Sequence, residues 1–234
     1  MKSSNGGCLH CSHQLCAKRV PIFSALEEKE LGQVVDLILR RQYEKGEMIL
    51  LEGAELDSLI IVNHGMVKAF RYTEEGKEQI LYLFSEGDFF GEKNLLSRGE
   101  ATYNAEALER THVCMIRNED FQELLRDYPE ISLKIIRELS SRLDRLEGAL
   151  QSMGTKNAEA RLSAVLLEFA GKYGTSHPEG IQFDLPFSRE GIANYIGAAR
   201  ETVSRRLNRL QEEGIIDMIG NKKIIIKDKN ALKL

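Results

Sequence analysis

The sequence predicts an α+β fold with a strand-rich N-terminal half, a long central helix, and two short helices followed by a hairpin at the C-terminal end. Three observations predict this arrangement. Between Arg41 and Arg117, short apolar runs alternate with glycine turns, as in an antiparallel sandwich or barrel. Between Ile136 and Met153, apolar residues recur with a period of 3.5, which is typical of paired helices. After Pro186, two helical segments flank a short turn that contains glycine.

Composition sets the broad class of the protein. The chain has 234 residues, of which 42% are hydrophobic and 29% charged, values typical of one large or two small globular domains. It has no apolar run near 18 residues and no signal-peptide pattern, so we expect a cytoplasmic protein that does not enter the membrane. The net charge of −4 is unevenly distributed along the chain, because the part from Thr155 onward contains 13 Lys and Arg but only 10 Asp and Glu. This basic excess at the C-terminal end is compatible with DNA contact.

Three cysteines lie within nine residues near the start of the chain: Cys8, Cys11 and Cys16. In a reducing cytoplasm, clustered cysteines bind metal or do redox chemistry more often than they form disulfides. Thiolates are soft ligands that select zinc or an iron–sulfur cluster. His10 and His13 could replace a thiolate in a zinc site, so both kinds of centre stay open from the spacing alone.

The part that follows is expected to begin with a helix over residues 24–40, with Ser24 as N-cap and Glu27 completing a capping box. Turn residues then separate six short apolar runs. The expected strands are Met48–Leu51, Leu59–Val62, Val67–Tyr72, Gln79–Phe84, Phe89–Phe90 and Thr111–Ile116. Cys114 lies in the last of them, where a lone cysteine is normally a small core residue.

A short helix over residues 118–127 is expected to end before Pro129, and a long helix to follow it. Its apolar positions are spaced 3, 4, 3, 4 and 3, and this dimer seam consists of Ile136, Leu139, Leu143, Leu146, Leu150 and Met153. Such a stripe is narrower than the face of a helix that packs only on its own domain, so it predicts a homodimer. Arg142 and Glu147 flank the seam and are expected to reach the partner helix.

The C-terminal part reads as a winged helix-turn-helix. After a helix over residues 157–172 and a polar loop over residues 174–179, Ser188 is expected to cap a new helix. The elements expected after it are the helix Arg189–Ile196, the turn Gly197–Ala199, the helix Arg200–Glu213 and a hairpin of Ile215–Ile219 with Lys223–Lys227. Two helices joined by a short turn with glycine form the DNA-binding helix-turn-helix.

The second of these helices carries the expected base-reading side chains. Glu201, Ser204 and Arg205 share one face near its N-terminus, the end that enters the major groove. Arginine can bond guanine and glutamate can accept from cytosine. The alternative is a solvated face with a Glu–Arg pair. Three further arginines are better suited to phosphates, namely Arg200, Arg206 and Arg209.

These features together resemble the Crp/Fnr transcription regulators over essentially the whole chain. Gly87-Asp88-Phe89-Phe90-Gly91-Glu92 looks like the sandwich motif of that family, and Arg200-Glu201-Thr202-Val203-Ser204-Arg205 looks like its recognition helix. The resemblance implies a cysteine-bearing segment over residues 1–22, a cyclic-nucleotide-binding-like jelly roll over 23–128, a dimerisation helix over 129–154 and a DNA-binding domain over 155–234. Lys156–Leu162 is similar to the segment after the dimer helix in the Fnr type, which senses oxygen.

The Fnr type holds an oxygen-labile 4Fe–4S cluster with three N-terminal cysteines and one cysteine on a late strand. Cys8, Cys11, Cys16 and Cys114 stand at matching places, although the second and third are one residue closer together here. The resemblance therefore implies cluster ligation by these four thiolates. It also implies a palindromic DNA site close to TTGAT-N4-ATCAA and control of anaerobic-metabolism genes through RNA polymerase.

Cyclic AMP is not expected, because the Arg-Ser pair of nucleotide-binding members aligns with Ala101-Thr102, and only Arg98 offers a substitute guanidinium. Leu146 replaces an aspartate of the Fnr type, so we expect the dimer to persist after cluster loss. Two alternatives remain open: regulation by zinc or thiol redox, and a small-molecule effector in the sandwich. An enzyme is not expected, because the chain has no phosphate-binding glycine loop, no HExxH and no recognisable Ser/His/Asp set.

Overall fold

The computed structural model describes residues 17–92, 99–155 and 157–232, without the side chains at 149 and 152–155. The chain divides into two compact units, Met1–Arg71 with Leu81–Asp144 and Tyr72–Ile80 with Arg145–Leu234. The four-part organisation expected from the sequence remains a prediction. No helix in the described ranges combines the length and the apolar character that crossing a membrane requires.

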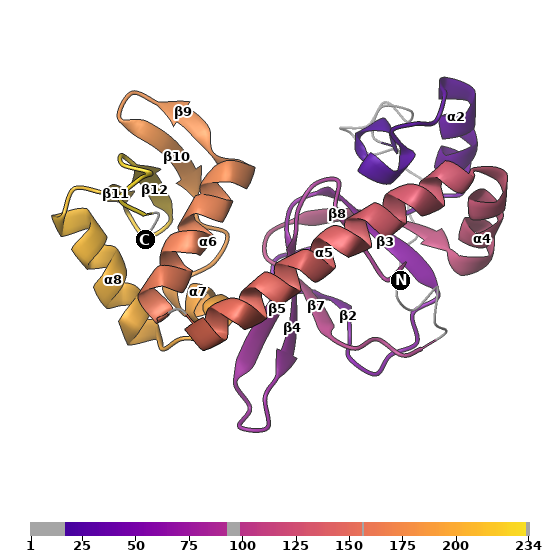
Figure 1. Cartoon of the computed structure of the whole chain (residues 1–234). Coiled ribbons are helices and arrows are strands. Elements are labelled where there is room, and N and C mark those ends of the chain that lie inside the picture. The colour runs from indigo at the N-terminus through magenta and orange to yellow at the C-terminus, as the bar shows by residue number, and fades with distance from the viewer. Residues whose placement is uncertain (1–16, 93–98, 156, 233–234) are drawn as a thin grey trace. The chain divides into compact units, whose positions relative to one another are not determined.

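The first unit is built on two antiparallel sheets (Figure 1). The strand order is β1-β8-β3-β6 in one sheet and β2-β7-β4-β5 in the other. The strands are β1 (Leu39–Tyr43), β2 (Met48–Leu50), β3 (Ser58–His64), β4 (Val67–Tyr72), β5 (Glu78–Phe84), β6 (Phe89–Phe90), β7 (Asn104–Ala107) and β8 (Thr111–Arg117). The sandwich expected from the apolar runs and glycine turns is confirmed.

The central strands β3 and β8 are buried on both faces, and this double burial creates two cores. Successive side chains on a strand point to opposite faces. Ile60 and Val113 therefore lie in the core between the sheets, whereas Ile61 and Cys114 lie in a second core on the outer face of the same sheet. The alternation thus places Cys114 outside the sandwich interior.

Helical segments cover this second core. They are a short 3₁₀ helix (Pro21–Phe23), α2 (Glu28–Asp36), α4 (Asn118–Asp127) and the first turns of α5 (Pro129–Thr155). Figure 1 shows α2 and α4 beside the N-terminal half of α5. Ile131 and Ile135 of α5 are buried there. The second core is therefore the place where the start of the described chain, the outer sheet face and the long helix meet.

The expected helix over residues 24–40 is wrong at both ends. The backbone N–H of Glu27 donates to Glu30 Oε2 (2.7 Å), so the helix begins after Glu27, and the Ser24 hydroxyl bonds Pro21 O instead. After Asp36 the chain turns into β1, which pairs with β8. Strands β1 and β7 have no continuous apolar run, and hydrogen bonding to neighbours distant in sequence forms them.

Within the described residues, the second unit contains the last turns of α5, three further helices and a four-stranded sheet of order β11-β12-β10-β9. The elements are α6 (Ala158–Tyr173), β9 (Thr175–His177), β10 (Gly180–Asp184), α7 (Arg189–Ile196), α8 (Arg200–Glu212), β11 (Ile216–Ile219) and β12 (Lys223–Ile226). The winged helix-turn-helix is confirmed, whereas the expected polar loop over residues 174–179 contains β9. Its core includes Leu162, Phe169, Ile192, Val203 and Leu207.

Candidate functional site

Cys114 is the one predicted metal ligand inside the described ranges, since Cys8, Cys11 and Cys16 lie outside them. Its side chain is 6% exposed and belongs to the second core together with Ala17. Ala17 is the residue directly after Cys16 in the chain. The cysteine-bearing segment therefore joins the described chain at the core that contains Cys114. No group of three or more His, Cys, Asp or Glu within the described ranges could hold a metal ion.

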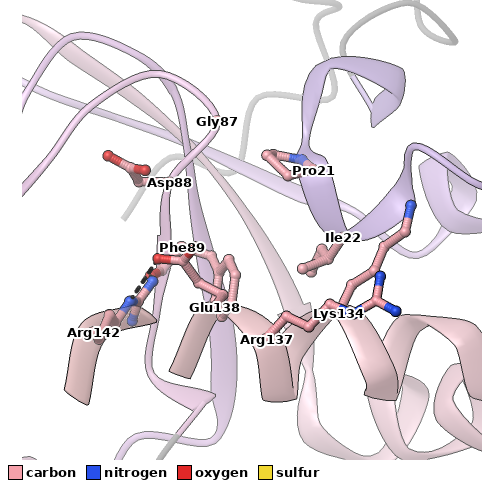
Figure 2. Close-up of a pocket in the computed structure, with 9 residues that line it drawn as sticks. All are labelled: Pro21, Ile22, Gly87, Asp88, Phe89, Lys134, Arg137, Glu138 and Arg142. Atoms are coloured by element: carbon pink, nitrogen blue, oxygen red, sulfur yellow. Dashed lines mark hydrogen bonds and ion pairs between the residues drawn. The ribbon is translucent and has the colours of Figure 1, made fainter. Parts of the chain in front are cut away.

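A pocket of about 280 Å³ lies where the 3₁₀ helix, the turn before β6 and α5 meet (Figure 2). Its lining comprises Pro21, Ile22, Gly87, Asp88, Phe89, Lys134, Arg137, Glu138 and Arg142. Beside it, Lys134 Nζ donates to Ser24 Oγ (2.6 Å). The segment that follows the cysteines thus contacts α5 directly, both through apolar packing and through this hydrogen bond.

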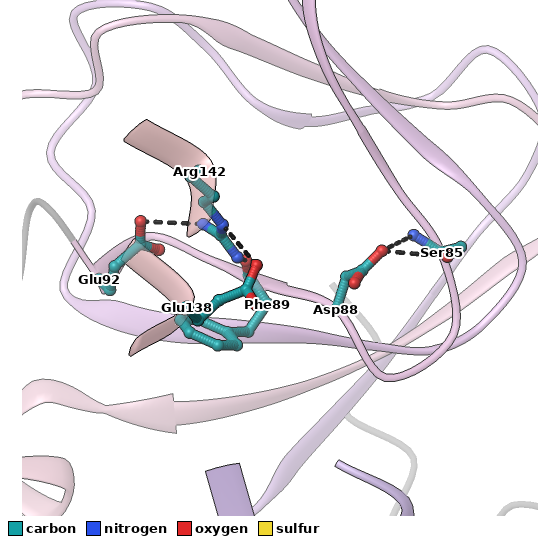
Figure 3. Close-up of polar contacts among 6 residues, drawn as sticks. All are labelled: Ser85, Asp88, Phe89, Glu92, Glu138 and Arg142. Carbon is teal, nitrogen blue, oxygen red and sulfur yellow. Dashed lines mark hydrogen bonds and ion pairs between the residues drawn. The ribbon is translucent and has the colours of Figure 1, made fainter. Parts of the chain in front are cut away.

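Arg142 is buried against its own domain, and the expectation that it reaches a partner helix is wrong (Figure 3). Its Nη1 donates to Glu92 Oε1 (3.1 Å), its Nη2 to the carbonyl oxygen of Phe89 (2.6 Å) and its Nε to Glu138 Oε1 (3.1 Å). The guanidinium carbon lies 4.7 Å from the ring centre of Phe89 and 5.4 Å from that of Phe84. The pattern of charges flanking the seam did not reveal this, because a carboxylate 50 residues away sets the orientation of Arg142.

Glu92 ends the Gly87–Glu92 motif and is 7% exposed. Burial raises the pKa of its carboxyl above the ordinary value, and the nearby Arg142 charge opposes that rise. Ala101, aligned with the arginine of nucleotide-binding members, is buried in the core between the sheets. Arg98 lies outside the described residues. The motif carboxylate is therefore already paired with a side chain of the same protein, and Ala101 offers no cation.

The apolar stripe of α5 that was predicted to be a dimer seam is largely exposed in a single chain. Ile136, Leu143, Leu146 and Leu150 are 58%, 56%, 38% and 70% exposed, while Leu139 packs partly against the second core. The side chain of Met153 lies outside the described residues. Leaving four large apolar side chains in water on one helix is costly, so this stripe is a surface that a partner would cover.

The recognition helix α8 presents Glu201 and Arg205 to solvent, with Ser204 half-buried between them and Arg200 exposed at its start. The preceding α7 is capped by Ser188, whose hydroxyl accepts from the Gly191 N–H. The turn between the two helices begins at Gly197, whose φ of 64° is a conformation that side chains disfavour.

The three arginines expected at phosphates differ in their surroundings. Arg206 is 6% exposed and pairs with Glu159 of α6 (3.6 Å), so it faces the core of the unit and is not placed for a phosphate contact. Arg209 is exposed and pairs with Glu213 (2.8 Å). The spacing of Arg206 along α8 predicted a phosphate contact and did not reveal this burial, because Glu159, its partner, lies on a different helix.

Arg161 of α6 is a positioning residue that the sequence did not reveal. Its Nε donates to the carbonyl oxygen of Ile196 (2.9 Å) and its Nη2 to that of Gly197 (3.1 Å). These carbonyls lie at the end of α7, where a helix leaves its last acceptors without intrahelical partners. Arg161 therefore holds the turn that orients the recognition helix.

Comparison with known families agrees with this architecture. Residues 40–128 match the cyclic nucleotide-binding domain, and residues 160–234 match the Crp-like helix-turn-helix domain. The chain is 34% identical over 235 residues to electron transport regulator A of Shewanella oneidensis, covering 100% of this chain and 93% of that protein. It is 32% identical over 234 residues to the fumarate and nitrate reduction regulatory protein of Escherichia coli K12, covering 97% and 91%.

Solved structures show the same fold. A CooA mutant from Carboxydothermus hydrogenoformans superposes with a TM-score of 0.74 at 26% identity, covering 86% of this chain and 88% of that one. FixK2 from Bradyrhizobium japonicum gives a TM-score of 0.74 at 26% identity, covering 83% and 95%. Both similarities extend across most of each chain, so they include the sandwich and the helix-turn-helix together.

Proposed function

This chain belongs to the Crp/Fnr family of DNA-binding transcription regulators, and we propose that within this family it senses oxygen through an iron–sulfur cluster. Proteins of this family are dimeric regulators and not enzymes. The proposed ligands are the thiolates of Cys8, Cys11, Cys16 and Cys114. In this proposal the protein is a cytoplasmic homodimer that controls anaerobic-metabolism genes through RNA polymerase.

The observation that carries the proposal is the position of Cys114. It lies on the outer sheet face, in the core that also receives Ala17, and not in the sandwich interior. A segment that enters at this core can bring three thiolates towards the fourth without crossing the sheet. Four thiolates fit an iron–sulfur cluster chemically, and the apolar surroundings of Cys114 exclude water from its side of the site.

An iron–sulfur cluster bound there would supply an oxygen-sensitive group, because oxygen can oxidise and break down such a cluster. The protein's own residues would report its presence through packing. Val20 and Ile22 share the second core with Ile131 and Ile135 of α5, so a cluster that held the cysteines beside this core would stabilise the packing of this end of the long helix. The Lys134–Ser24 hydrogen bond adds a polar link between the same two elements.

DNA reading is proposed for the exposed start of α8. Arg205 and Glu201 are free of the core and stand on the face that enters the major groove in helix-turn-helix proteins. Arg200 and Arg209 would bind phosphates, and Arg206 would instead hold α8 to α6. The proposed site is a palindrome close to TTGAT-N4-ATCAA, because a symmetric dimer reads two half-sites related by the same symmetry.

The test of cluster sensing is to purify the protein without oxygen, determine iron, sulfide and zinc, and record the visible spectrum before and after air. We expect a coloured protein that bleaches in air and loses affinity for the palindrome. Cys114→Ala and Cys114→Ser should both be colourless. The alanine variant keeps the site apolar, so a coloured Cys114→Ala protein would show that the thiol is no ligand.

A colourless wild-type protein with stoichiometric zinc would refute the cluster and favour zinc or thiol regulation. His10 and His13 beside the cysteines are the observation that keeps this second candidate in view. Metal analysis separates the two candidates directly.

A further inference from the structure

Two histidine side chains meet at one end of the sandwich, on neighbouring strands of the same sheet. His64 ends β3 and His112 is the second residue of β8, and the two are direct partners in the antiparallel pairing of these strands. Their imidazole ring centres lie 6.0 Å apart, with an angle of 63° between the ring planes. His64 is exposed and His112 is half-buried, so the pair is open to solvent on the side of His64.

An irregularity in the strand pairing creates this contact. Val62 pairs with Val113. A regular register would continue this pairing with Asn63 opposite His112. The register instead shifts between Val62 and His64, so that His64 takes the position opposite His112. A bulge of this kind re-aims a side chain, and bulges occur often beside functional sites.

The backbone around the two histidines is closely packed. Gly65, directly after His64, has a φ of +92°, and a Cβ there would approach Thr111 Oγ1 at 2.6 Å and Thr111 Cα at 2.9 Å. Thr111, directly before His112, is 0% exposed, and its hydroxyl donates to the carbonyl oxygen of Glu109 (2.9 Å). Both imidazoles therefore extend from backbone that the opposite strand holds in place.

Arg110, two residues before His112 in the chain, is engaged by side chains of β1 and the turn after it. Its Nη2 donates to Gln42 Oε1 (3.1 Å), and its Nε lies 3.6 Å from Glu44 Oε1. Gln42 is the partner of His112 on β1. The Glu44 carboxylate therefore offsets part of the positive charge that Arg110 would place near a bound cation.

We propose that His64 and His112 together bind one divalent ion of a late transition metal, such as Zn²⁺ or Ni²⁺, through one ring nitrogen each. Imidazole is a ligand that these ions prefer. A tetrahedral ion with metal–nitrogen bonds of about 2.0–2.1 Å would set the two ring centres roughly 5 Å apart, so the observed 6.0 Å requires only a small rotation of the exposed ring. Two imidazoles are fewer ligands than a closed structural site has, so solvent would complete the coordination.

This site is separate from the four proposed cluster thiolates, and the proposal requires neither the cluster nor the dimer. Cys114 follows His112 by two residues on the same outer sheet face, about 7 Å along β8. A bound ion would join β3 to β8 at the end of the sheet that carries Cys114. It would stabilise the folded sandwich, because the unfolded chain does not hold the two imidazoles together.

The test uses the full chain with Cys8, Cys11 and Cys16 replaced by serine, so that these thiolates cannot take the metal. Titration calorimetry of this parent protein with zinc chloride, and separately with nickel chloride, should show one bound ion with a dissociation constant of about 1–100 µM. His64→Ala and His112→Ala in the same background should each weaken binding at least tenfold.

The other three histidines of the chain provide the controls. His177→Ala removes a half-buried histidine from β9 in the second unit and should bind zinc within twofold of the parent protein. The double replacement His10→Ala with His13→Ala should also bind within twofold. Unchanged zinc binding in His64→Ala would overturn the proposal, and so would a parent protein that binds no zinc at 1 mM.

Thermal unfolding separates the loss of a ligand from the loss of the fold. His64 is exposed, so His64→Ala is expected to fold, and this variant decides the question if His112→Ala does not fold. Zinc should raise the unfolding temperature of the parent protein and leave that of His64→Ala unchanged. In proton NMR spectra of the parent protein, the ring signals of His64 and His112 should shift in the same titration step. An equal zinc-induced rise of the unfolding temperature in both proteins would refute the site.

Discussion

Replacing Leu146 by aspartate tests whether the stripe on α5 is a permanent dimer seam. Leu146 is 38% exposed in a single chain, so dimerisation can bury up to that share of its side chain. Full burial of a leucine is worth about 1.5–3 kcal/mol, which gives about 0.6–1.1 kcal/mol per chain and about 1–2 kcal/mol per dimer. Since about 1.4 kcal/mol is a factor of ten, the dimer dissociation constant should rise about five- to thirtyfold, before the repulsion between two carboxylates is added.

The assay is sedimentation velocity of the metal-free protein at micromolar concentration. Wild type should remain a dimer, because Leu143 and Leu150 are also exposed in a single chain and a second copy can bury them. Leu146→Asp should shift towards monomer. Leu51→Asp is the matched control, since Leu51 is an exposed leucine outside α5 (56%). A mainly monomeric wild type, or a Leu146→Asp protein as dimeric as wild type, would refute the reasoning.

Three further predictions concern single side chains. Arg161→Met should destabilise the C-terminal unit by about 1–2 kcal/mol and weaken DNA binding, because two helix-end carbonyls lose a charged donor; thermal unfolding and gel shifts measure both. Arg205→Ala should weaken DNA binding by about 1–3 kcal/mol and relax the specificity at one base pair. Arg209→Ala should weaken binding to all DNA sequences alike. Binding competition with variants of the half-site would distinguish the two effects. The raised pKa of Glu92 means that the folded state holds this proton longer than the unfolded state. Stability should therefore fall as pH rises from about 4.5 through the raised value, and urea titrations should show this slope reduced in Glu92→Gln; an equal slope in both proteins would contradict the assignment.

Patterns that are local in sequence were sufficient for most of the fold. The strands β3, β4, β5, β6 and β8 follow from apolar runs bounded by glycine turns, and the helix-turn-helix follows from Ser188, Gly197 and the hairpin after it. Local signals failed for β1 and β7, whose residues are polar or small and which form by pairing with distant strands. They also failed at Glu27, because two carboxylates there act as cap and capping partner in place of Ser24.

The sequence by itself determined the fold class, the exposed face of α8 and the apolar repeat on α5, because these depend on spacing along one element. Only the tertiary structure decided which way the charged side chains turn. Arg142 and Arg206 both read as surface residues from their spacing, yet each is buried beside a glutamate from another part of the chain, at positions 92 and 159. The physical reason is that burying a charge is favourable only with a partner, and the fold alone determines where that partner lies.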